Sequence, residues 1–329
     1  LQAPDRVPPG RLTDIQPYRS MVRLAIIGKA KSPNPLPCFQ NWQTEKVLDR
    51  SDDSIDYLAH ETFAPLKKMR LRAYPLDWLM DAQEREQQRK LLSRSYQALT
   101  GLPFCPHILP IKTCFETPDQ DFLVLVQEEL TASPIHQFAQ QQHPDRDRFN
   151  LWVSALLTTL NLLHQHQVLH RNLTPDQVLI TPDVQLYLTG FDYARLGQNQ
   201  TTIAQDPEVI AALAAKARYH APECYEDPGK ASPQSDLFSA GVIFYEVLTG
   251  QCPFASAEEI FDRHAQFPQP ASHLNPNCPS SLDQWLQALC AFQPADRPLS
   301  ADSALKTFAQ LTTSPPEPIP APSPVLELA

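Results

Sequence analysis

The most informative part of this chain reads His170-Arg171-Asn172-Leu173-Thr174-Pro175-Asp176-Gln177-Val178-Leu179-Ile180. Its polar head is followed by an apolar run, and further short patterns lie on both sides of it in a definite order. They are Leu163-His164, Val168-Leu169, Leu188-Thr189-Gly190-Phe191-Asp192, Ala221-Pro222-Glu223, Ser235 to Val242, Leu248-Thr249-Gly250, Pro253-Phe254 and Asp296-Arg297-Pro298. Each pattern is weak by itself, but their order and spacing together make a strong signal.

These patterns resemble the motifs of the protein kinase superfamily, in its Ser/Thr branch. The opening stretch resembles the catalytic loop H-R-D-L-x-x-x-N, Leu188 to Asp192 takes the place of D-F-G, and Ala221-Pro222-Glu223 matches A-P-E. The resemblance spans residues 45–311. It implies an α+β, two-lobed protein-kinase-like fold, with a strand-rich N-lobe and a helical C-lobe.

Hydrophobic patterning along the chain agrees with that order of elements. Short β-rich runs predict strands over Ile55 to Ala59, Met69 to Tyr74 and Phe122 to Val126. Longer amphipathic or apolar segments predict helices over Arg148 to His166 and Asp236 to Leu248. We therefore expect strands mainly before residue 130 and helices mainly after it.

Four segments are expected along the chain. Residues 1–44 form an N-terminal extension in which Met21 to Ile27 adds a strand to the N-lobe, and residues 45–130 form the N-lobe. Residues 131–311 form the C-lobe, and 312–329 are a proline-rich disordered tail. Within the C-lobe, Pro207 to Arg218 is expected to be helical.

The resemblance implies structural roles for five residues. Glu223 is expected to pair with Arg297 in a buried ion pair, and Asp236 to accept hydrogen bonds from the backbone of the catalytic loop. His170 and Phe191 are expected to stack in an apolar spine. All five roles concern shape, and they remain useful without any chemistry.

The positions that carry chemistry in the family hold other residues here. Asn172 stands where the resemblance places the catalytic Asp, and a neutral amide is a negligible base. Gln177 stands where a metal-binding Asn is expected, and Gly190 replaces the Asp of D-F-G. Asp176 and Asp192 are the weak candidates for relocated metal ligands. No intact catalytic or metal residue is therefore expected.

The motifs that contact the nucleotide in the family are altered as well. Arg72 takes the place of the strand-3 Lys, although Arg70 or Lys68 would serve in another register. The slot for its usual Glu partner falls near residues 94–96, which hold no carboxylate.

The glycine-rich loop is the other altered element on this side. Ser54 to Ala59 resembles the end of that loop, G-x-V-Y-x-A, but the glycine slots hold Asp49, Ser51 and Ser54. Glycine would let backbone N–H groups approach phosphates closely. The candidate nucleotide pocket that remains consists of Ala59, Arg72, Gln127 and Leu179.

Composition narrows the possible partners. The net charge of -10 and pI of about 5.4 argue against nucleic acid. No apolar run reaches the length of a membrane helix. Seven cysteines without a C-x-x-C pair indicate reduced thiols and a cytoplasmic location. The chain begins at Leu1, which leaves room for an upstream segment.

The function expected from these observations is that of a catalytically inactive protein-kinase-like domain, a pseudokinase. It would act as a scaffold or allosteric regulator by binding another protein, such as an active kinase or signalling component. Two alternatives stay open: a nucleotide sensor that binds ATP or ADP without turnover, and an atypical Ser/Thr kinase that uses Asp176 or Asp192. Mg²⁺ binding has little support in either case.

Overall fold

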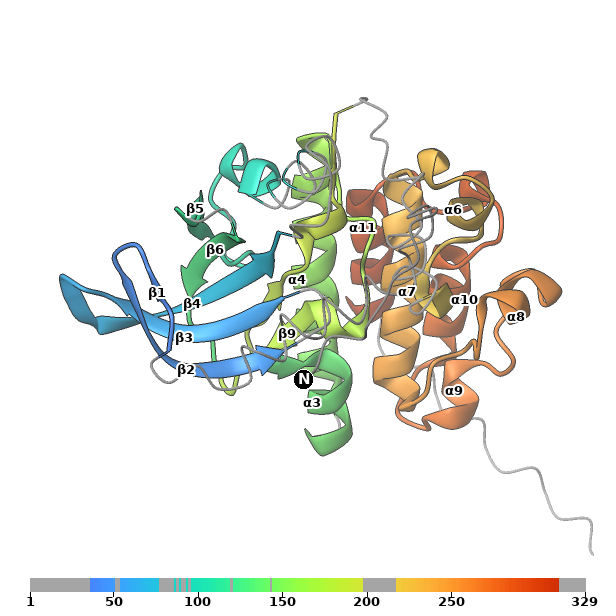
Figure 1. Ribbon diagram of the computed structural model, residues 1–329. Helices are drawn as coiled ribbons and strands as arrows, with labels where there is room; N and C mark the ends of the chain where they lie inside the picture. Colours follow the sequence, from blue (N-terminus) through green and yellow to red (C-terminus); the bar gives the residue numbers. More distant parts are fainter. Residues whose placement is uncertain are drawn as a thin grey trace, which may run out of the picture. The chain divides into compact units, whose positions relative to one another are not determined.

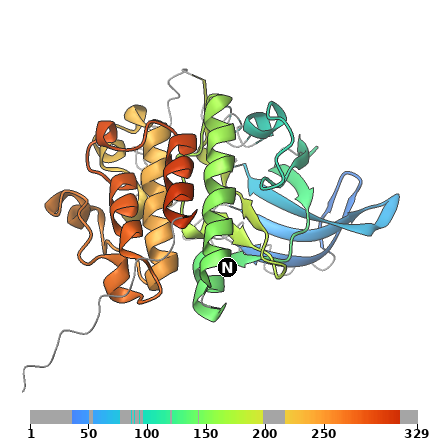
Figure 2. The same ribbon diagram turned by 180° about the vertical axis from the view of Figure 1, so that it is seen from behind.

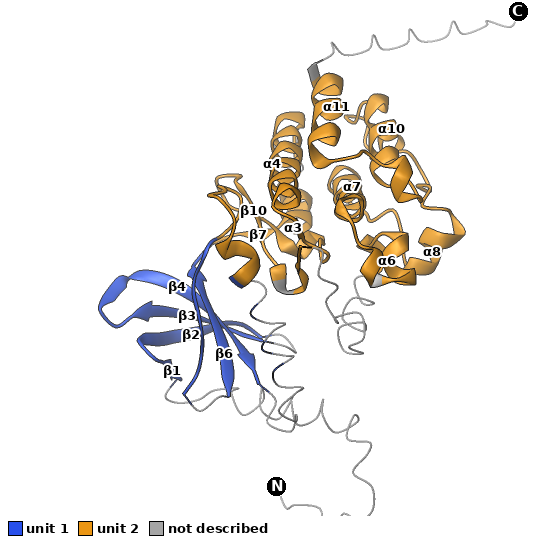
Figure 3. Ribbon diagram, turned by 90° about the horizontal axis from the view of Figure 1, so that it is seen from above, with its two compact units in different colours: residues 1–96, 110–130 blue, residues 97–109, 131–329 orange. Residues whose placement is uncertain are grey.

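The computed structural model describes residues 36–50, 54–76, 86, 89, 93, 96–118, 121–142, 144–197 and 217–313. The chain divides into two compact units, shown in different colours in Figure 3. Unit 1 comprises Leu1–Tyr96 and Pro110–Leu130, and unit 2 comprises Gln97–Leu109 and Thr131–Ala329. The expected strand at Met21 to Ile27, most of the expected helix at Pro207 to Arg218, and residues 314–329 lie outside the described residues. Thr312 and Thr313, which were expected to begin the tail at 312–329, are instead the last residues of a helix, because Thr312 Oγ1 and its neighbours continue the helical hydrogen bonding.

Unit 1 is built on an antiparallel sheet in the order β1-β2-β3-β4-β6-β5. The six strands carry the blue to green colours of Figure 1. Their bounds are β1 Cys38–Phe39, β2 Trp42–Arg50, β3 Ile55–Glu61, β4 Ala64–Pro75, β5 Ile111–Glu116 and β6 Phe122–Glu128. The sequence prediction of strands at Ile55, Met69 and Phe122 is confirmed.

The two faces of this sheet differ in chemistry because side chains alternate along each strand. On one face Tyr57 lies opposite Leu71, which lies opposite Val126, and this row belongs to the hydrophobic core of the unit. On the other face Asp56 lies opposite Arg72. The strand register therefore brings two charged side chains together.

Unit 2 is mainly helical. Its long helices are α4 Arg146–Gln165, α7 Pro233–Thr249, α10 Ser280–Leu289 and α11 Ala301–Thr313, with α4 beside α11 and α7 beside α10 (Figure 2). Shorter helices are α3 Ile135–Gln142, α6 Pro222–Glu226, α8 Ala257–Asp262 and α9 Ala271–Leu274. Single 3₁₀ turns are η1 Pro175–Gln177, η2 Phe191–Tyr193, η4 Ala217–Tyr219, η5 Pro228–Lys230 and η6 Pro294–Asp296. Its strands are β7 Ser133–Pro134, β8 Val168–Leu169, β9 Val178–Ile180, β10 Leu186–Leu188 and β11 Arg195–Leu196.

Local signals set the ends of the two central helices. Asp145 caps α4 by accepting a 2.8 Å hydrogen bond from the backbone N–H of Arg148. Ser232 and Ser235 form a reciprocal capping box at the start of α7. Gly250 ends α7 in the left-handed region, with φ 76°. The predicted helices over Arg148 to His166 and Asp236 to Leu248 are confirmed.

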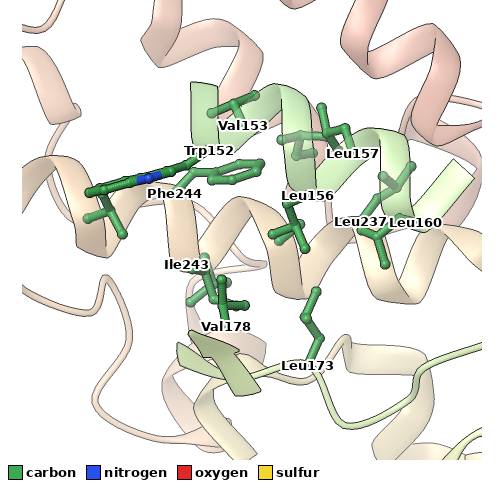
Figure 4. Close-up of a cluster of buried hydrophobic side chains, with 14 of the residues drawn as sticks. Trp152, Val153, Leu156, Leu157, Leu160, Leu173, Val178, Leu237, Ile243 and Phe244 are labelled. Atoms are coloured by element: carbon green, nitrogen blue, oxygen red, sulfur yellow. The ribbon is translucent and has the colours of Figure 1, made fainter. Parts of the chain in front are cut away.

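The core of unit 2 anchors the catalytic-loop stretch. Figure 4 shows Leu156 and Leu160 of α4 and Leu237 of α7 converging, with Leu173 and Val178 beneath them. All five side chains are buried. The loop is therefore fixed by apolar packing on both sides of its polar residues.

Residues 97–109 group with unit 2, although the sequence pattern predicts them in the first lobe. Ala98 and Ile108 pack into the hydrophobic core of unit 2. The backbone N–H of Leu188 also donates a 2.8 Å hydrogen bond to the carbonyl of His107. This pairing follows from tertiary contacts that no local pattern encodes. None of the helices that the structure describes combines the length and the apolar character of a membrane-spanning segment.

Candidate functional site

Asp236, in the first turn of α7, organises the backbone of the catalytic loop. Its Oδ2 accepts a 3.0 Å hydrogen bond from the N–H of His170, and its Oδ1 accepts a 2.9 Å bond from the N–H of Arg171. Arg171 has φ 64°, in the left-handed region that disfavours a side chain. The two bonds therefore hold the loop in a conformation that is costly without them.

Asp236 also pairs with a histidine. The Nε2 of His164, at the end of α4, lies 2.9 Å from Asp236 Oδ2. Burial by itself raises the pKa of the Asp236 carboxyl. The hydrogen bond and charge of His164 lower this pKa by more than burial raises it, so the pKa falls below its usual value. A carboxylate that is only 2% exposed thus stays ionised.

His170 and Phe191 lie ring against ring, with centroids 4.9 Å apart in an edge-to-face geometry. The Nε2 of His170 donates to the carbonyl of Thr189 over 2.8 Å, which places its proton on that nitrogen. Both side chains are buried. This contact joins the catalytic loop to the segment that follows β10.

Asn172 stands at the base position in this organised loop. The residue is 3% exposed, and its backbone N–H donates to Nδ1 of His170 at 3.4 Å. Asp176, four residues later, is exposed in η1, whereas the side chain of Asp192 lies outside the described residues. The structure therefore holds a buried neutral amide at position 172.

Gln177 and Gly190 lie against each other. Gln177 Oε1 accepts a 3.2 Å hydrogen bond from Oγ1 of Thr189, and the Gln177 carbonyl accepts a 2.9 Å bond from the Thr189 N–H. A Cβ atom on Gly190 would lie 2.1 Å from Gln177 Oε1. No side chain at position 190 fits while Gln177 keeps this rotamer.

The arrangement at Gln177 and Gly190 does not fit the Mg²⁺ ion that the fold family implies. Mg²⁺ takes oxygen ligands, chiefly carboxylates and phosphates, in near-octahedral geometry. Gly190 offers no side-chain ligand, and an amide fills the space in front of it. Among the described residues, no group of three or more His, Cys, Asp or Glu side chains could hold a metal ion.

Glu223 and Arg297 form a bidentate ion pair in the interior of unit 2. The two N···O distances are 2.8 and 2.9 Å, and the Arg297 side chain is fully buried. Ser235 Oγ donates to Glu223 Oε1 at 2.7 Å. Burial raises the pKa of Glu223, but Arg297 and Ser235 outweigh it, and the pKa is lowered. The pair ties α6 to the segment before α11.

Unit 1 places Arg72 in a second bidentate pair. Its Nε and Nη2 donate to the two carboxylate oxygens of Asp56, at 2.8 and 2.9 Å. Asp56 comes from β3 and is 4% exposed, and it also accepts a 3.4 Å hydrogen bond from Arg70. The Arg72 cation on β4 thus meets a carboxylate on the neighbouring strand β3.

Three residues of the candidate nucleotide pocket lie in unit 1, where they do not share one face of the sheet. Gln127 lies opposite Arg70 and shares the face that carries Arg72. Ala59 lies opposite Met69 on the other face, fully buried in the apolar core of unit 1, so it cannot serve beside Arg72. Leu179 belongs to β9 of unit 2, where it pairs with Tyr187.

Sequence reasoning missed Asp56. In the pattern G-x-V-Y-x-A, this residue occupies the position of the apolar V, and in V-A-I-K Arg70 occupies the position of the small A. An acidic residue between Ile55 and Tyr57 was the available signal, because strand positions that face another layer are normally apolar. The register of β3 against β4 was needed to show its partner.

The comparison with family models decides the family. The model of the protein kinase domain matches residues 78–308, which is most of the chain. The chain belongs to the protein kinase domain family. Its two-lobed α+β architecture, with a strand-rich first lobe, agrees with that membership.

Relatives among characterised proteins are Ser/Thr and mitogen-activated kinases. The chain is 29% identical over 182 residues to the probable serine/threonine-protein kinase PknB of Lactococcus lactis, covering 54% of this chain and 28% of that protein. It is 29% identical over 227 residues to mitogen-activated protein kinase 13 of Oryza sativa, covering 57% of this chain and 44% of that protein. It is 27% identical over 203 residues to the serine/threonine-protein kinase PrkC of Bacillus subtilis, covering 58% of this chain and 29% of that protein. The chain thus spans less than half of each relative.

Proposed function

We propose that this chain is a catalytically inactive protein kinase domain that works by binding another protein, as a scaffold or an allosteric regulator. The observation that carries the proposal is Asn172, a neutral amide at the base position of a loop whose supporting contacts are complete. Asp236 holds the backbone of that loop at His170 and Arg171. The shape of the loop is kept, and the group that would accept the hydroxyl proton is not there.

Magnitudes support inactivity. Losing a general base typically lowers a rate by about 10²–10⁴-fold. Phosphoryl transfer depends further on Mg²⁺ to neutralise the developing charge. The space between the Gln177 side chain and Gly190, which we call the Gln177–Gly190 corner, does not fit that ion. A typical kinase turnover of about 1–100 s⁻¹ would fall below ordinary detection under both losses.

Nucleotide sensing is the less favoured alternative. Asp56, which pairs with Arg72, and the neighbouring Arg70 occupy positions that would present an apolar and a small side chain in the family pattern. An adenine ring placed against this face would have to desolvate the charged pair. We therefore expect no stabilisation of the chain by millimolar ATP or ADP in a thermal-shift assay, with or without Mg²⁺.

The activity test is direct. The purified chain is incubated with γ-labelled ATP, generic substrate protein, and Mg²⁺ or Mn²⁺, beside the Asn172→Ala variant as a matched control. We expect equal background signal from both. Transfer by the wild type that Asn172→Ala or Asp176→Ala abolishes would show that the domain is an active kinase.

The binding role needs a positive readout. A partner is first identified by cross-linking in the native host, and its own activity is then measured with and without equimolar wild-type chain. We expect a change in the activity of the partner that Asn172→Ala preserves and the destabilised Arg297→Met variant loses. A partner activity that never responds to the chain would argue against regulation.

A further inference from the structure

Gly190 and the side chain of Gln177 compete for one volume. Gly190 has φ 79°, and a Cβ built on it would lie 2.1, 2.4 and 2.8 Å from Oε1, Cδ and Cγ of Gln177. Real Cβ atoms essentially never come within 3.0 Å of such neighbours. Three atoms of one side chain therefore stand where any substituent of residue 190 would begin.

Gln177 is held in that position. The single hydroxyl proton of Thr189 is shared between Oε1 and the backbone carbonyl of Gln177, each 3.2 Å from Oγ1, and that carbonyl also accepts from the Thr189 N–H. The Thr189 carbonyl accepts in turn from His170. The amide cannot leave the corner without giving up its bond to Thr189, so its position is set by the ends of β9 and β10.

We propose that Gln177 is a built-in occupant of the corner where the family pattern places a cation, and that Gln177 and Gly190 form one coupled replacement. The amide fills the corner and bonds to Thr189, and glycine at 190 makes room for it. The family pattern places an Asn at position 177, and its side chain is shorter by one methylene, about 1.5 Å. The extra methylene carries the amide toward Gly190.

This inference rests on the proposed function only in one respect, namely that the Gln177–Gly190 corner corresponds to the place of the metal ion in the family pattern. Its consequence is that an aspartate restored at position 190 alone would meet the end of the Gln177 side chain and would have to displace that amide before it could reach an ion. The replacement of the two residues is therefore expected to be energetically non-additive.

A double-mutant cycle on thermal stability tests the coupling. The variants are Gly190→Ala, Gln177→Ala and the double variant. Gly250→Ala is the matched control, because Gly250 has φ 76° and no atom within 4 Å of the Cβ that alanine would add. Backbone strain alone should lower the Tm of the control by about 2–6 °C.

We expect Gly190→Ala to lower the Tm by roughly twice as much as the Gly250→Ala control, since it adds the collision with Gln177 to the same strain. In the Gln177→Ala background the cost of Gly190→Ala should fall to that of the control. We also expect no shift of the wild-type Tm with millimolar Mg²⁺ or Mn²⁺ in the absence of nucleotide.

An additive cycle would overturn the proposal, as would a Mg²⁺-dependent rise of the wild-type Tm that Gln177→Ala removes. These outcomes are separate from the fate of the proposed function. Phosphoryl transfer by the wild type together with a non-additive cycle would sink inactivity and keep the coupled replacement. An additive cycle without phosphoryl transfer would do the reverse.

Discussion

Glu223 and Arg297 show at the scale of single residues how this chain keeps its kinase shape. Arg297 also donates to the carbonyls of Ala291, Gln234 and Phe292, and its guanidinium lies 4.9 Å from the ring centroid of Phe238. Each N–H of the fork thus has an acceptor, which a fully buried cation requires. The backbone carbonyls that accept the remaining N–H groups of Arg297 hold its guanidinium in one orientation, facing the Glu223 carboxylate.

Replacing Arg297 by Met should lower the free energy of unfolding by about 3–5 kcal/mol, because Glu223 is left buried without its partner. Urea denaturation measures the loss. Lys306→Met is the control, since Lys306 pairs with Asp302 on an exposed surface and should cost at most about 0.5 kcal/mol. The double variant Glu223→Gln, Arg297→Met should recover part of the loss, and equal losses in single and double variants would contradict this account.

Packing between secondary-structure elements depends on close approach at one glycine and on one charged strand pair. In α7, a Cβ on Gly241 would lie 2.6 Å from Cys290 Sγ and 2.8 Å from Leu289 Cβ, at the end of α10. In unit 1, Asp56 of β3 and Arg72 of β4 are directly opposite each other in the strand register, and their ion pair joins the two strands. Neither contact can be read from the pattern of one element.

Gly241→Ala should destabilise unit 2 by about 1–3 kcal/mol, because one methyl group has to separate α7 from α10. The improved helix propensity of alanine, about 1 kcal/mol, offsets only part of this cost. Gly101→Ala, with no atom within 4 Å of the added Cβ, is the control and should stay within about 0.5 kcal/mol of wild type. A stabilised Gly241→Ala variant would mean that the helices relax freely.

Arg72→Met should lower stability by about 2 kcal/mol, since the buried Asp56 carboxylate keeps only the 3.4 Å contact with Arg70. The combined variant Asp56→Val, Arg72→Met replaces both partners by apolar side chains and should recover most of the loss. Chemical denaturation followed by near-ultraviolet circular dichroism reports both. Equal loss in the single and double variants would show that the ion pair has no special role.

Acid stability is a property of the whole molecule. Asp236 and Glu223 have folded-state pKa values below their ordinary values of 3.8 and 4.5. Groups with a depressed folded pKa contribute stability that is complete above the unfolded pKa and is lost as the pH falls through the folded pKa.

We therefore expect the free energy of unfolding to be steady from pH 7 to about pH 5 with respect to these two groups, and to fall below about pH 4.5. Urea midpoints across this range measure the effect. Asp236→Asn should flatten the acid slope while lowering stability at neutral pH. A slope that Asp236→Asn and Glu223→Gln leave unchanged would assign acid unfolding to other groups.

Much of the fold could be predicted from the sequence because its signals are local. The α7 helix has its capping box and Gly250, α4 has Asp145, and the strands of unit 1 show β-rich apolar runs. The placement of residues 97–109 could not be predicted, since it depends on Ala98 and Ile108 packing into the core of unit 2. The candidate site divides in the same way: motif order identified Asn172, Gln177 and Gly190, but their contacts needed the folded chain.

Residue identities at fixed spacings were enough to predict the family and the order of the elements, and they predict the substitutions at Asn172, Gln177, Gly190 and Arg72. The folded chain was needed to show that Gln177 fills the space beside Gly190, that Arg72 pairs with Asp56, and that Ala59 faces the apolar core. Rotamers, strand register and side-chain volume decide these contacts. They depend on neighbours far away in the chain, so only folding brings them together.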